Sequence, residues 1–316
     1  MHSSVPLTAA LMAFALLAAA PQATAGASVP APSAARSDPA RFTFAATARV
    51  GDIHLTELSG LAWDEDEKRL YAVSDTGHLF HFRLRLDGDA IAAIEPISAV
   101  ALADPQGIGA KAGEFNAEGL TLRNATNGVP GDSELVVALE GKPSRLARFG
   151  TDGRLLGELE VPSPAADLSL YRKKGRGLEA LAIHPDYGLL TAPEAPLLGQ
   201  PETLHTVYAK GRHWSFARQS PGSRLKALDV QAHGELLVLE RNKAGSKNAL
   251  SASLRRVDLA ACGLDDLCQA DTLAVLPVGP DNFEGMTLLD SRHLLLVSDN
   301  ASLVTRDTLF VLLVWP

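Results

Sequence analysis

The sequence has little of what most nucleotide-using enzymes and nucleic-acid-binding proteins need. Its 29 lysines and arginines are outnumbered by 37 aspartates and glutamates, and the net charge of −8 opposes binding to nucleic acids. It has only two cysteines, with no histidine nearby, which excludes a zinc site built on them. No Gly-x-Ser-x-Gly elbow, P-loop or dinucleotide-binding fingerprint is present. No long stretch beyond residue 25 shows the periodicity of a helix, and we therefore expect an all-β protein.

Long apolar runs are also missing beyond residue 25, so no membrane insertion is expected of the mature chain. Before that point, residues 7–20 are apolar and uncharged, and Ala23-Thr24-Ala25 is an Ala-x-Ala cleavage site. Residues 1–25 are therefore predicted to be a secretory signal peptide, which places the protein in the periplasm or outside a bacterial cell. Residues 26–40 are rich in Ala, Pro and Ser and are expected to form a disordered leader.

The two cysteines, Cys262 and Cys268, enclose residues 263–267. In the oxidising compartment that a signal peptide implies, this spacing predicts a small disulfide-closed loop between two strands. A pair of free thiols is the alternative. Neither interpretation gives the cysteines a part in chemistry.

One short pattern recurs five times along the chain. Each copy has a polar lead residue, then a small residue, then two apolar residues that flank a small or polar one. The copies are roughly 50 to 60 residues apart, which fits one four-stranded propeller blade with its loops. They are Ser59-Gly60-Leu61-Ala62-Trp63, Glu118-Gly119-Leu120-Thr121-Leu122, Glu179-Ala180-Leu181-Ala182-Ile183, Lys226-Ala227-Leu228-Asp229-Val230 and Glu284-Gly285-Met286-Thr287-Leu288.

A second short apolar run follows each copy and ends on a carboxylate, and in most copies two further strands can be assigned after it. These strands predict a single β-propeller over residues 41–316, with five blades visible and six possible. The last copy has only residues 308–314 left for a third strand, whereas residues 41–50 alternate like a lone strand. We expect this N-terminal strand to complete the fifth blade and close the ring, which removes exposed sheet edges.

Carboxylates from several blades should gather at one opening of this propeller. The start of the innermost strand and the end of the second strand lie on the same face, and charged residues interrupt the apolar pattern at both places. Their repulsion would be relieved by protonation, by basic side chains or by a bound cation. The lead residues of the first strands are Ser59, Glu118, Glu179, Lys226 and Glu284, and the second strands end on Asp75, Glu140, Glu194, Glu240 and Asp299.

A hard divalent cation suits such a set of carboxylate oxygens. We expect Ca²⁺, with Mg²⁺ as the alternative. A polar residue at a strand end can also simply terminate an apolar run, but agreement across most copies favours a shared site. The expected metal ligands are Glu118, Glu179, Glu284, Asp75 and Asp299.

These residues predict a metal-dependent hydrolase of ester or phosphoester bonds, because a bound cation polarises a substrate oxygen and activates water. The candidates for the general base are Glu57, Glu140, Glu194 and Glu240, and Arg241 is the candidate for steadying an anionic group. The substrate would be a small-molecule ester or phosphoester. The alternative is a non-catalytic propeller that binds a ligand or an envelope partner and uses the metal structurally. We expect a monomer in both cases.

Several motifs occur in a fixed order over residues 42–314. The first copy pairs Glu57-Leu58-Ser59-Gly60-Leu61-Ala62-Trp63-Asp64 with Leu70-Tyr71-Ala72-Val73-Ser74-Asp75, and later motifs are Asn116-Ala117-Glu118-Gly119-Leu120, Leu239-Glu240-Arg241-Asn242, Asn282-Phe283-Glu284-Gly285-Met286 and Leu296-Val297-Ser298-Asp299-Asn300. Together they resemble the phytase-like esterase domain family of exported bacterial proteins. The resemblance implies a propeller with esterase-like activity. The Arg-His-Gly signature of histidine acid phosphatases is absent, so a covalent phosphohistidine route is not expected.

Overall fold

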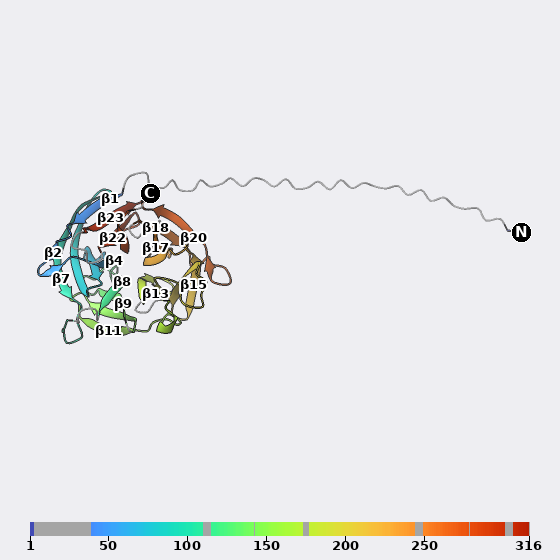
Figure 1. Ribbon diagram of the computed structural model, residues 1–316, viewed down its shortest axis with the longest axis horizontal. Coiled ribbons are helices and arrows are strands. Elements are labelled where there is room, and N and C mark those ends of the chain that lie inside the picture. Colours follow the sequence, from blue (N-terminus) through green and yellow to red (C-terminus); the bar gives the residue numbers. More distant parts are fainter. Residues whose placement is uncertain are drawn as a thin grey trace. The chain divides into compact units, whose positions relative to one another are not determined.

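Five sheets of mainly antiparallel strands are arranged around one axis in this computed structural model (Figure 1). It describes residues 1–2, 39–109, 115–141, 143–172, 177–243, 249–277, 279–300 and 306–315. The chain divides into two units, Met1–Ser33 and Ala34–Pro316, and all five sheets belong to the second. The predicted signal peptide and most of the predicted leader fall on residues 3–38, which lie outside the described residues.

Each sheet is one blade of a five-bladed propeller, so the predicted fold class is confirmed. Blade one consists of β4 (Leu58–Asp64), β5 (Arg69–Ser74), β6 (His78–Asp87) and β7 (Ala90–Ala101). Blade two consists of β8 (Asn116–Arg123), β9 (Glu134–Glu140), β10 (Arg145–Gly150) and β11 (Leu155–Leu159). Blade three consists of β12 (Leu178–His184), β13 (Gly188–Pro193), β14 (Leu204–Ala209) and β15 (Arg212–Ala217). Blade four consists of β16 (Arg224–Val230), β17 (Leu236–Lys243), β18 (Leu250–Val257) and β20 (Ala270–Val275).

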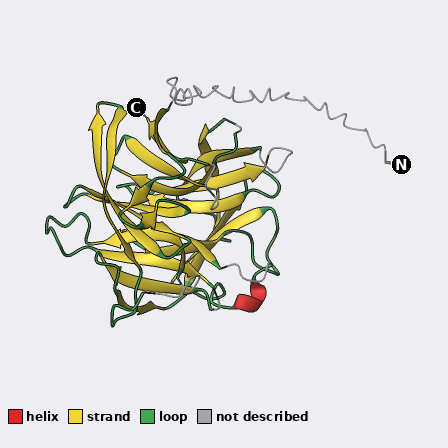
Figure 2. Ribbon diagram, turned by 60° about the vertical axis from the view of Figure 1, so that its left-hand side comes forward, coloured by secondary structure: helices red, strands yellow, loops and turns green. Residues whose placement is uncertain are grey.

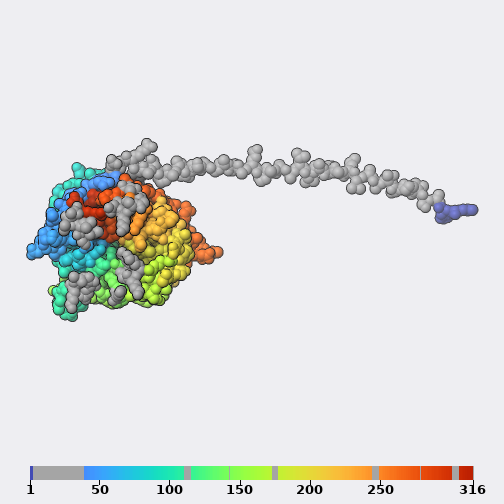
Figure 3. Space-filling view, in the orientation of Figure 1, coloured from blue at the N-terminus to red at the C-terminus, as the bar shows by residue number. Residues whose placement is uncertain are grey.

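Blade five joins the two ends of the propeller. It consists of β21 (Asn282–Leu288), β22 (His293–Asp299), β23 (Thr308–Val314) and the N-terminal strand β1 (Ala40–Phe44), which pairs with β23 so that Phe42 lies opposite Phe310. The predicted closure of the ring is therefore confirmed. In the space-filling view the blue N-terminal residues of the propeller accordingly lie beside the red C-terminal ones (Figure 3).

The closing strand is shorter than the sequence predicted, because residues 49–54 form a separate hairpin. Its strands are β2 (Arg49–Val50) and β3 (Ile53–His54). The turn between them contains Gly51, whose φ of 59° lies in the left-handed region that glycine adopts at little cost. The predicted strand over residues 41–50 thus ends at Phe44.

The apolar core lies between the blades. Five clusters of buried side chains each join two neighbouring blades, including the Phe80, Phe82 and Phe310 cluster between blades one and five and the Trp214 and Phe216 cluster between blades three and four. A strand in the middle of a blade is therefore covered on both faces. This explains why the second strands are continuous apolar runs, as in β22, where every residue is buried.

The predicted disulfide between Cys262 and Cys268 is present. It closes a loop whose last residues form β19 (Leu267–Cys268), and β19 pairs in parallel with β15. A short segment that follows β18 of blade four thereby becomes a fifth strand of blade three. The disulfide loop is a structural link between two blades.

Helix is almost absent from the described part of the chain. The 3-10 turn η1 (Leu168–Leu170) is the red segment in Figure 2. Within the same residues, no helix has the length and apolar character needed to cross a bilayer.

Candidate functional site

The lead residues of the five innermost strands form a buried polar ring at one end of the propeller axis. They are Ser59 on β4, Glu118 on β8, Glu179 on β12, Lys226 on β16 and Glu284 on β21, and each is at most 6% exposed. The ring is tight, because carboxylate oxygens of Glu118, Glu179 and Glu284 all lie within 4.8 Å of one another. The structure therefore brings together the three central predicted ligands.

A β-bulge at each lead residue sets this convergence. In all five blades the pairing of the first strand with the second shifts register at the lead residue or the residue beside it, for example between Leu58 and Gly60. A bulge leaves a residue without a direct partner and changes where its side chain points. Five bulges at equivalent positions therefore give the five lead side chains a common placement.

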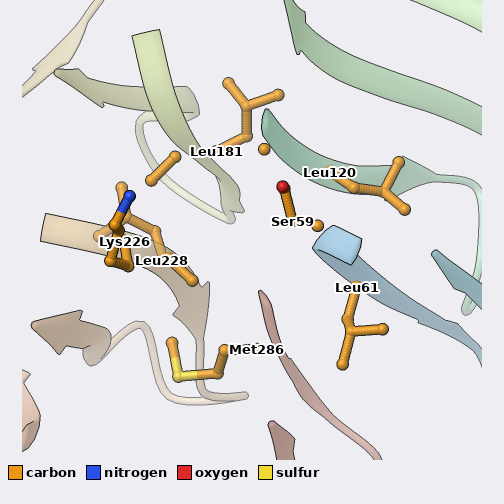
Figure 4. A pocket seen from close by; sticks show the side chains of 11 residues that line it. Ser59, Leu61, Leu120, Leu181, Lys226, Leu228 and Met286 are labelled. Carbon is orange, nitrogen blue, oxygen red and sulfur yellow. The ribbon is translucent and has the colours of Figure 1, made fainter. Parts of the chain in front are cut away.

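Apolar side chains close the axis directly behind the polar ring. The residues two places after the lead residues line a small cavity together with Ser59 and Lys226, and Figure 4 shows them arranged around it. Between the two rings lies a position that is Gly or Ala in every blade, because the innermost strands nearly touch: a Cβ on Gly60 would lie 2.8 Å from the Cβ of Leu120. The apolar ring consists of Leu61, Leu120, Leu181, Leu228 and Met286.

Lys226 holds three carboxylates of this site. Its Nζ lies 2.6 Å from Glu284 Oε1 and 3.0 Å from Glu194 Oε1, and it also donates to Glu179 Oε1. An ammonium group has three N–H donors, so the three carboxylates satisfy it completely. Burial alone would lower the pKa of Lys226, but the three negative charges raise it well above its usual range.

Two arginines also form ion pairs with the carboxylates that surround Lys226. Arg241 Nη2 lies 3.0 Å from Glu194 Oε1, while its Nη1 lies 3.2 Å from Glu284 Oε1 and donates to Asn282 Oδ1 at 2.6 Å. Arg224 Nη1 donates to Glu194 Oε2 at 2.5 Å. Glu194 therefore contacts three cationic side chains, those of Arg224, Lys226 and Arg241.

Asp75 and Glu118 lie on the other side, where no lysine or arginine of the described residues forms an ion pair with them. Burial and then the charge of Glu284 raise the pKa of Asp75 to about 8, although the Ser59 hydroxyl donates to it. Burial, followed by the charges of Glu179 and Asp75, raises the pKa of Glu118 well above its usual range. On this side of the site ionisation is therefore unfavourable unless a proton or a cation compensates it.

Glu179 joins the two sides. Its Oε1 accepts from Lys226, but its Oε2 is buried and has no hydrogen-bond partner among the described residues. Burial raises the pKa of Glu179, and Lys226 opposes that shift. A buried carboxylate oxygen without a donor is costly, and a proton or a cation would relieve it. We name the five residues Asp75, Glu118, Glu179, Lys226 and Glu284 the axial cluster.

Two asparagines connect the axial cluster to the carboxylates at the ends of the second strands. Asn116 Nδ2 donates to Glu118 Oε1 at 3.2 Å and to Glu140 Oε2 at 3.0 Å. Asn282 repeats this arrangement in blade five, with Glu284 at 2.8 Å and Asp299 at 3.2 Å. Sequence reasoning gave neither asparagine a role, although the repeated Asn-x-Glu-Gly motif was a signal that could have identified both.

A backbone hydrogen bond holds Glu57 beside Asp75. Its amide donates to Asn300 Oδ1 at 3.0 Å, its carbonyl accepts from the Asp75 amide at 3.1 Å, and its φ of 54° is in the left-handed region. The charge of Glu57 also contributes to the raised pKa of Asp75. The structure thus places Glu57, Glu140, Glu194 and Asp299 around the axial cluster, as the sequence predicted.

Glu240 is not the counterpart of these residues, and the prediction that it ends the second strand at this opening is wrong by one position. Arg241 lies opposite Arg224 in the sheet, as Glu140 lies opposite Asn116 and Asp299 opposite Asn282. Successive side chains of a strand point to opposite faces, so the offset of one residue turns Glu240 away from the axis.

Glu240 instead lies in a buried network between blades three and four. It accepts hydrogen bonds from Ser223 Oγ at 2.6 Å, Arg255 Nη1 at 2.9 Å, the Gln219 amide at 3.0 Å and His205 Nε2 at 3.2 Å. Burial raises the pKa of Glu240, but His205 and then the hydrogen bonds from Ser223 and the Gln219 amide outweigh burial and lower the pKa to about 2.

The donor set of the axial cluster fits a hard cation. Glu118, Glu179 and Glu284 offer only carboxylate oxygens, which Ca²⁺ and Mg²⁺ prefer. The buried, partnerless Oε2 of Glu179 and the unpaired charge of Glu118 are what such a cation would satisfy. Lys226 already neutralises part of the cluster, so the Glu118 side is where a further positive charge fits best.

Comparison with known proteins identifies a family for this chain. A family model described as "Phytase-like: Esterase-like activity of phytase" matches residues 53–301. No curated protein matches the sequence.

Several solved structures are distantly similar to this chain. A luciferin-regenerating enzyme is 12% identical, with 87% of this chain and 95% of that chain covered and a TM-score of 0.44. A gluconolactonase from Xanthomonas campestris is 14% identical, with 91% and 99% covered and a TM-score of 0.42. U3-55K is 8% identical, with 85% and 99% covered and a TM-score of 0.46. Similarities this distant give no information about the chemistry of this chain.

Proposed function

The chain belongs to the phytase-like family, and from that premise we propose that it is an exported hydrolase of ester or phosphoester bonds that works at the axial cluster. One observation carries the choice of site: Glu118, Glu179 and Glu284 come from three blades, are buried, and place carboxylate oxygens within 4.8 Å of one another. Like charges this close and this buried raise the free energy of the folded protein. Their presence is best explained by a use in binding or chemistry.

A divalent cation, Ca²⁺ in the first place and Mg²⁺ in the second, would be held by Glu118, Glu179 and Glu284, with Asp75 and Asp299 close by. When bound, such a cation supplies positive charge that polarises a substrate oxygen and makes water easier to deprotonate. The proposal is supported by the partnerless Oε2 of Glu179 and the raised pKa of Glu118, because a cation relieves both.

Asp75 is the residue best placed to carry a proton. Its pKa, raised to about 8, lies near neutral pH, where a carboxyl group both accepts and donates protons effectively. The Ser59 hydroxyl donates to Oδ1 and fixes the orientation of the group. We therefore place Asp75 ahead of Glu57, Glu140 and Glu194 as the general base. Glu240 has no place in this proposal, because it lies between two blades.

Arg241 would contact an anionic group of the substrate. Its side chain is 15% exposed, whereas the Lys226 side chain is 2% exposed. Three carboxylates already use all the donors of Lys226, so Lys226 is left to position Glu179 and Glu284. Arg241 still has donors beyond those bound to Glu194, Glu284 and Asn282.

The test is hydrolysis of 4-nitrophenyl acetate and 4-nitrophenyl phosphate by the purified chain, with added Ca²⁺ or with a chelator. We expect turnover of one of the two in Ca²⁺, and a loss of about 100-fold or more in kcat/KM in Glu118→Gln. Glu95→Gln, which changes a half-exposed glutamate on β7, is the matched control and should retain full activity.

Two results would overturn this function. Turnover that survives in Glu118→Gln would move the chemistry elsewhere. Binding of Ca²⁺ without turnover of either ester would favour the alternative, a propeller that binds a ligand or an envelope partner and uses its metal structurally.

A further inference from the structure

Blade four reverses the charge at the two positions where blades two, three and five all contribute carboxylates. It has Lys226 where blades two, three and five have Glu118, Glu179 and Glu284. At the end of its second strand it has Arg241, which the register of the sheet makes the counterpart of Glu140 and Asp299. One blade thus turns two anionic positions into cationic ones.

The ammonium group of Lys226 has the surroundings of a metal ion. Carboxylate oxygens approach it from three residues, Glu179 and Glu194 of blade three and Glu284 of blade five, with distances of 3.0 Å to Glu194 and 2.6 Å to Glu284. The side chain is 2% exposed, so water contributes little to its solvation. Oxygen ligands gathered from separate strands around one buried positive charge are also how proteins bind hard cations.

We propose that Lys226 is a tethered cation that fills one cation position of the axial cluster and confines a divalent cation to the side of Glu118. This inference rests on the part of the proposed function that places a hard cation at the axial cluster, and it does not require hydrolysis.

Two observations locate the remaining position on the Glu118 side. Lys226 binds Glu179 through Oε1, whereas Oε2 of the same carboxylate is buried and has no partner among the described residues. Glu118 offers an oxygen within 4.8 Å of Glu179 and Glu284 but forms no ion pair with a described lysine or arginine. Lys226 therefore lies on one side of Glu179, and the proposed divalent cation would lie on the other side, next to Glu118.

The proposal predicts that Lys226 weakens the binding of divalent cations at the site it helps to form. An ammonium group and a divalent cation held by the same carboxylates repel each other strongly, because little water lies between them to screen the charges. A neutral side chain at position 226 should therefore increase the affinity for Ca²⁺ by about 10-fold or more, or add a second bound ion.

The experiment is calorimetric titration of the purified chain with Ca²⁺ alone. Lys226→Met removes the charge and keeps an unbranched side chain, and Lys226→Arg keeps the charge. Lys210→Met, at a residue that is 90% exposed, is the matched control for the loss of one positive charge. We expect tighter or additional binding only in Lys226→Met. Adding Glu118→Gln to Lys226→Met should abolish the gain.

The outcomes separate this inference from the proposed function. If wild type binds Ca²⁺ and Lys226→Met binds it with the same affinity and number of ions, the inference fails while the proposed function stands. If only Lys226→Met binds Ca²⁺, the inference holds and the cation of the proposed function is lost. If neither chain binds Ca²⁺ or Mg²⁺, both fail.

A folding defect need not hide the answer, because removal of Lys226 leaves its carboxylates uncompensated. Folding of Lys226→Met that is restored by added Ca²⁺ supports the inference. If Ca²⁺ does not restore it, the double variant Lys226→Met with Glu194→Gln removes one of the stranded charges and is titrated in the same way. Affinity for Ca²⁺ no higher than that of wild type in this double variant overturns the inference.

Discussion

Glu118 and Glu240 are both buried glutamates of this propeller, 5% and 0% exposed, yet their surroundings are opposite. Glu240 accepts hydrogen bonds from Ser223, Arg255, His205 and the Gln219 amide. Against the effect of burial, His205, Ser223 and the Gln219 amide lower its pKa to about 2. Among the described residues, Glu118 receives one hydrogen bond, from Asn116, and it faces Glu179, Asp75 and Glu284.

The difference shows that burial alone does not decide whether a carboxylate stabilises or destabilises the fold. A buried charge with enough donors stabilises the fold, whereas one that faces like charges raises the free energy of the folded state. Glu240 is placed to hold blades three and four together. Burial of Glu118 costs stability, which fits the cation-binding role proposed for it.

The largest effect is expected from Glu240→Gln, which should lower the free energy of unfolding by about 3–5 kcal/mol because it leaves Arg255 and His205 buried without their anion. Urea denaturation followed by fluorescence measures this. Glu95→Gln, at a half-exposed site, should change stability little. Stability of Glu240→Gln equal to that of wild type would remove the contrast between the two glutamates.

Acid should act through the same glutamate. Its pKa falls from 4.5 to about 2 on folding, so its stabilisation is fully present above pH 4.5 and is lost as the pH falls toward 2, by on the order of 3 kcal/mol. Burial lowers the pKa of His205, so this histidine also reduces the stability of the folded state as the pH falls below 6.5.

Urea midpoints measured from pH 7 to pH 3 test this prediction. Wild type should lose stability steeply below pH 4.5, and Glu240→Gln should lose distinctly less over the same interval. Parallel curves for the two proteins would show that other carboxylates control the acid sensitivity.

Added Ca²⁺ should have the next largest effect on stability. This effect should depend on Glu118 and not on Glu240. A ligand that binds only the folded state at 100 times its Kd stabilises it by about 2.7 kcal/mol. Thermal unfolding with increasing Ca²⁺ measures the gain. Glu118→Gln should abolish the gain, and Glu240→Gln should keep it on top of a lower starting stability. An equal gain in all three proteins would place the ion outside the axial cluster.

The smallest effect is expected from Glu118→Gln without divalent cations. Gln keeps the shape of the side chain but needs no proton or cation when it is buried beside Glu179 and Asp75, so the substitution should raise the free energy of unfolding at neutral pH by about 1–2 kcal/mol. Urea denaturation in a chelator measures it. A clear loss of stability would mean that Glu118 serves the fold, as Glu240 does.

The pattern of the strands made the propeller predictable. Polar, small and apolar residues recur at equivalent places in all five blades because every innermost strand meets the same neighbours at the axis. Phe42 and its neighbours could be assigned to the closing strand because the last copy of the repeat lacked a fourth strand. The end of that strand at Phe44 was not predictable, since the hairpin around Gly51 competes for the same residues.

The axial cluster was only partly predictable. Glu118, Glu179 and Glu284 could be found because each begins a copy of the repeat, and Asn116 and Asn282 could have been found from their shared motif. Asp75 could be named as a ligand, but its raised pKa depends on how close Glu284 comes in space.

The sequence by itself determined a propeller, its closure by the N-terminal strand and the face on which the carboxylates gather, because these follow from a repeat and from the spacing of its copies. The structure settled that the blades number five and that the two cysteines form a disulfide. Only the tertiary structure decided which carboxylates meet. A shift of one residue in a strand turns a side chain to the opposite face, so the pairing of Arg241 with Arg224 sends Glu240 into the wall between two blades. The three carboxylates around Lys226 belong to two other blades, and no local pattern records how close together folding brings them.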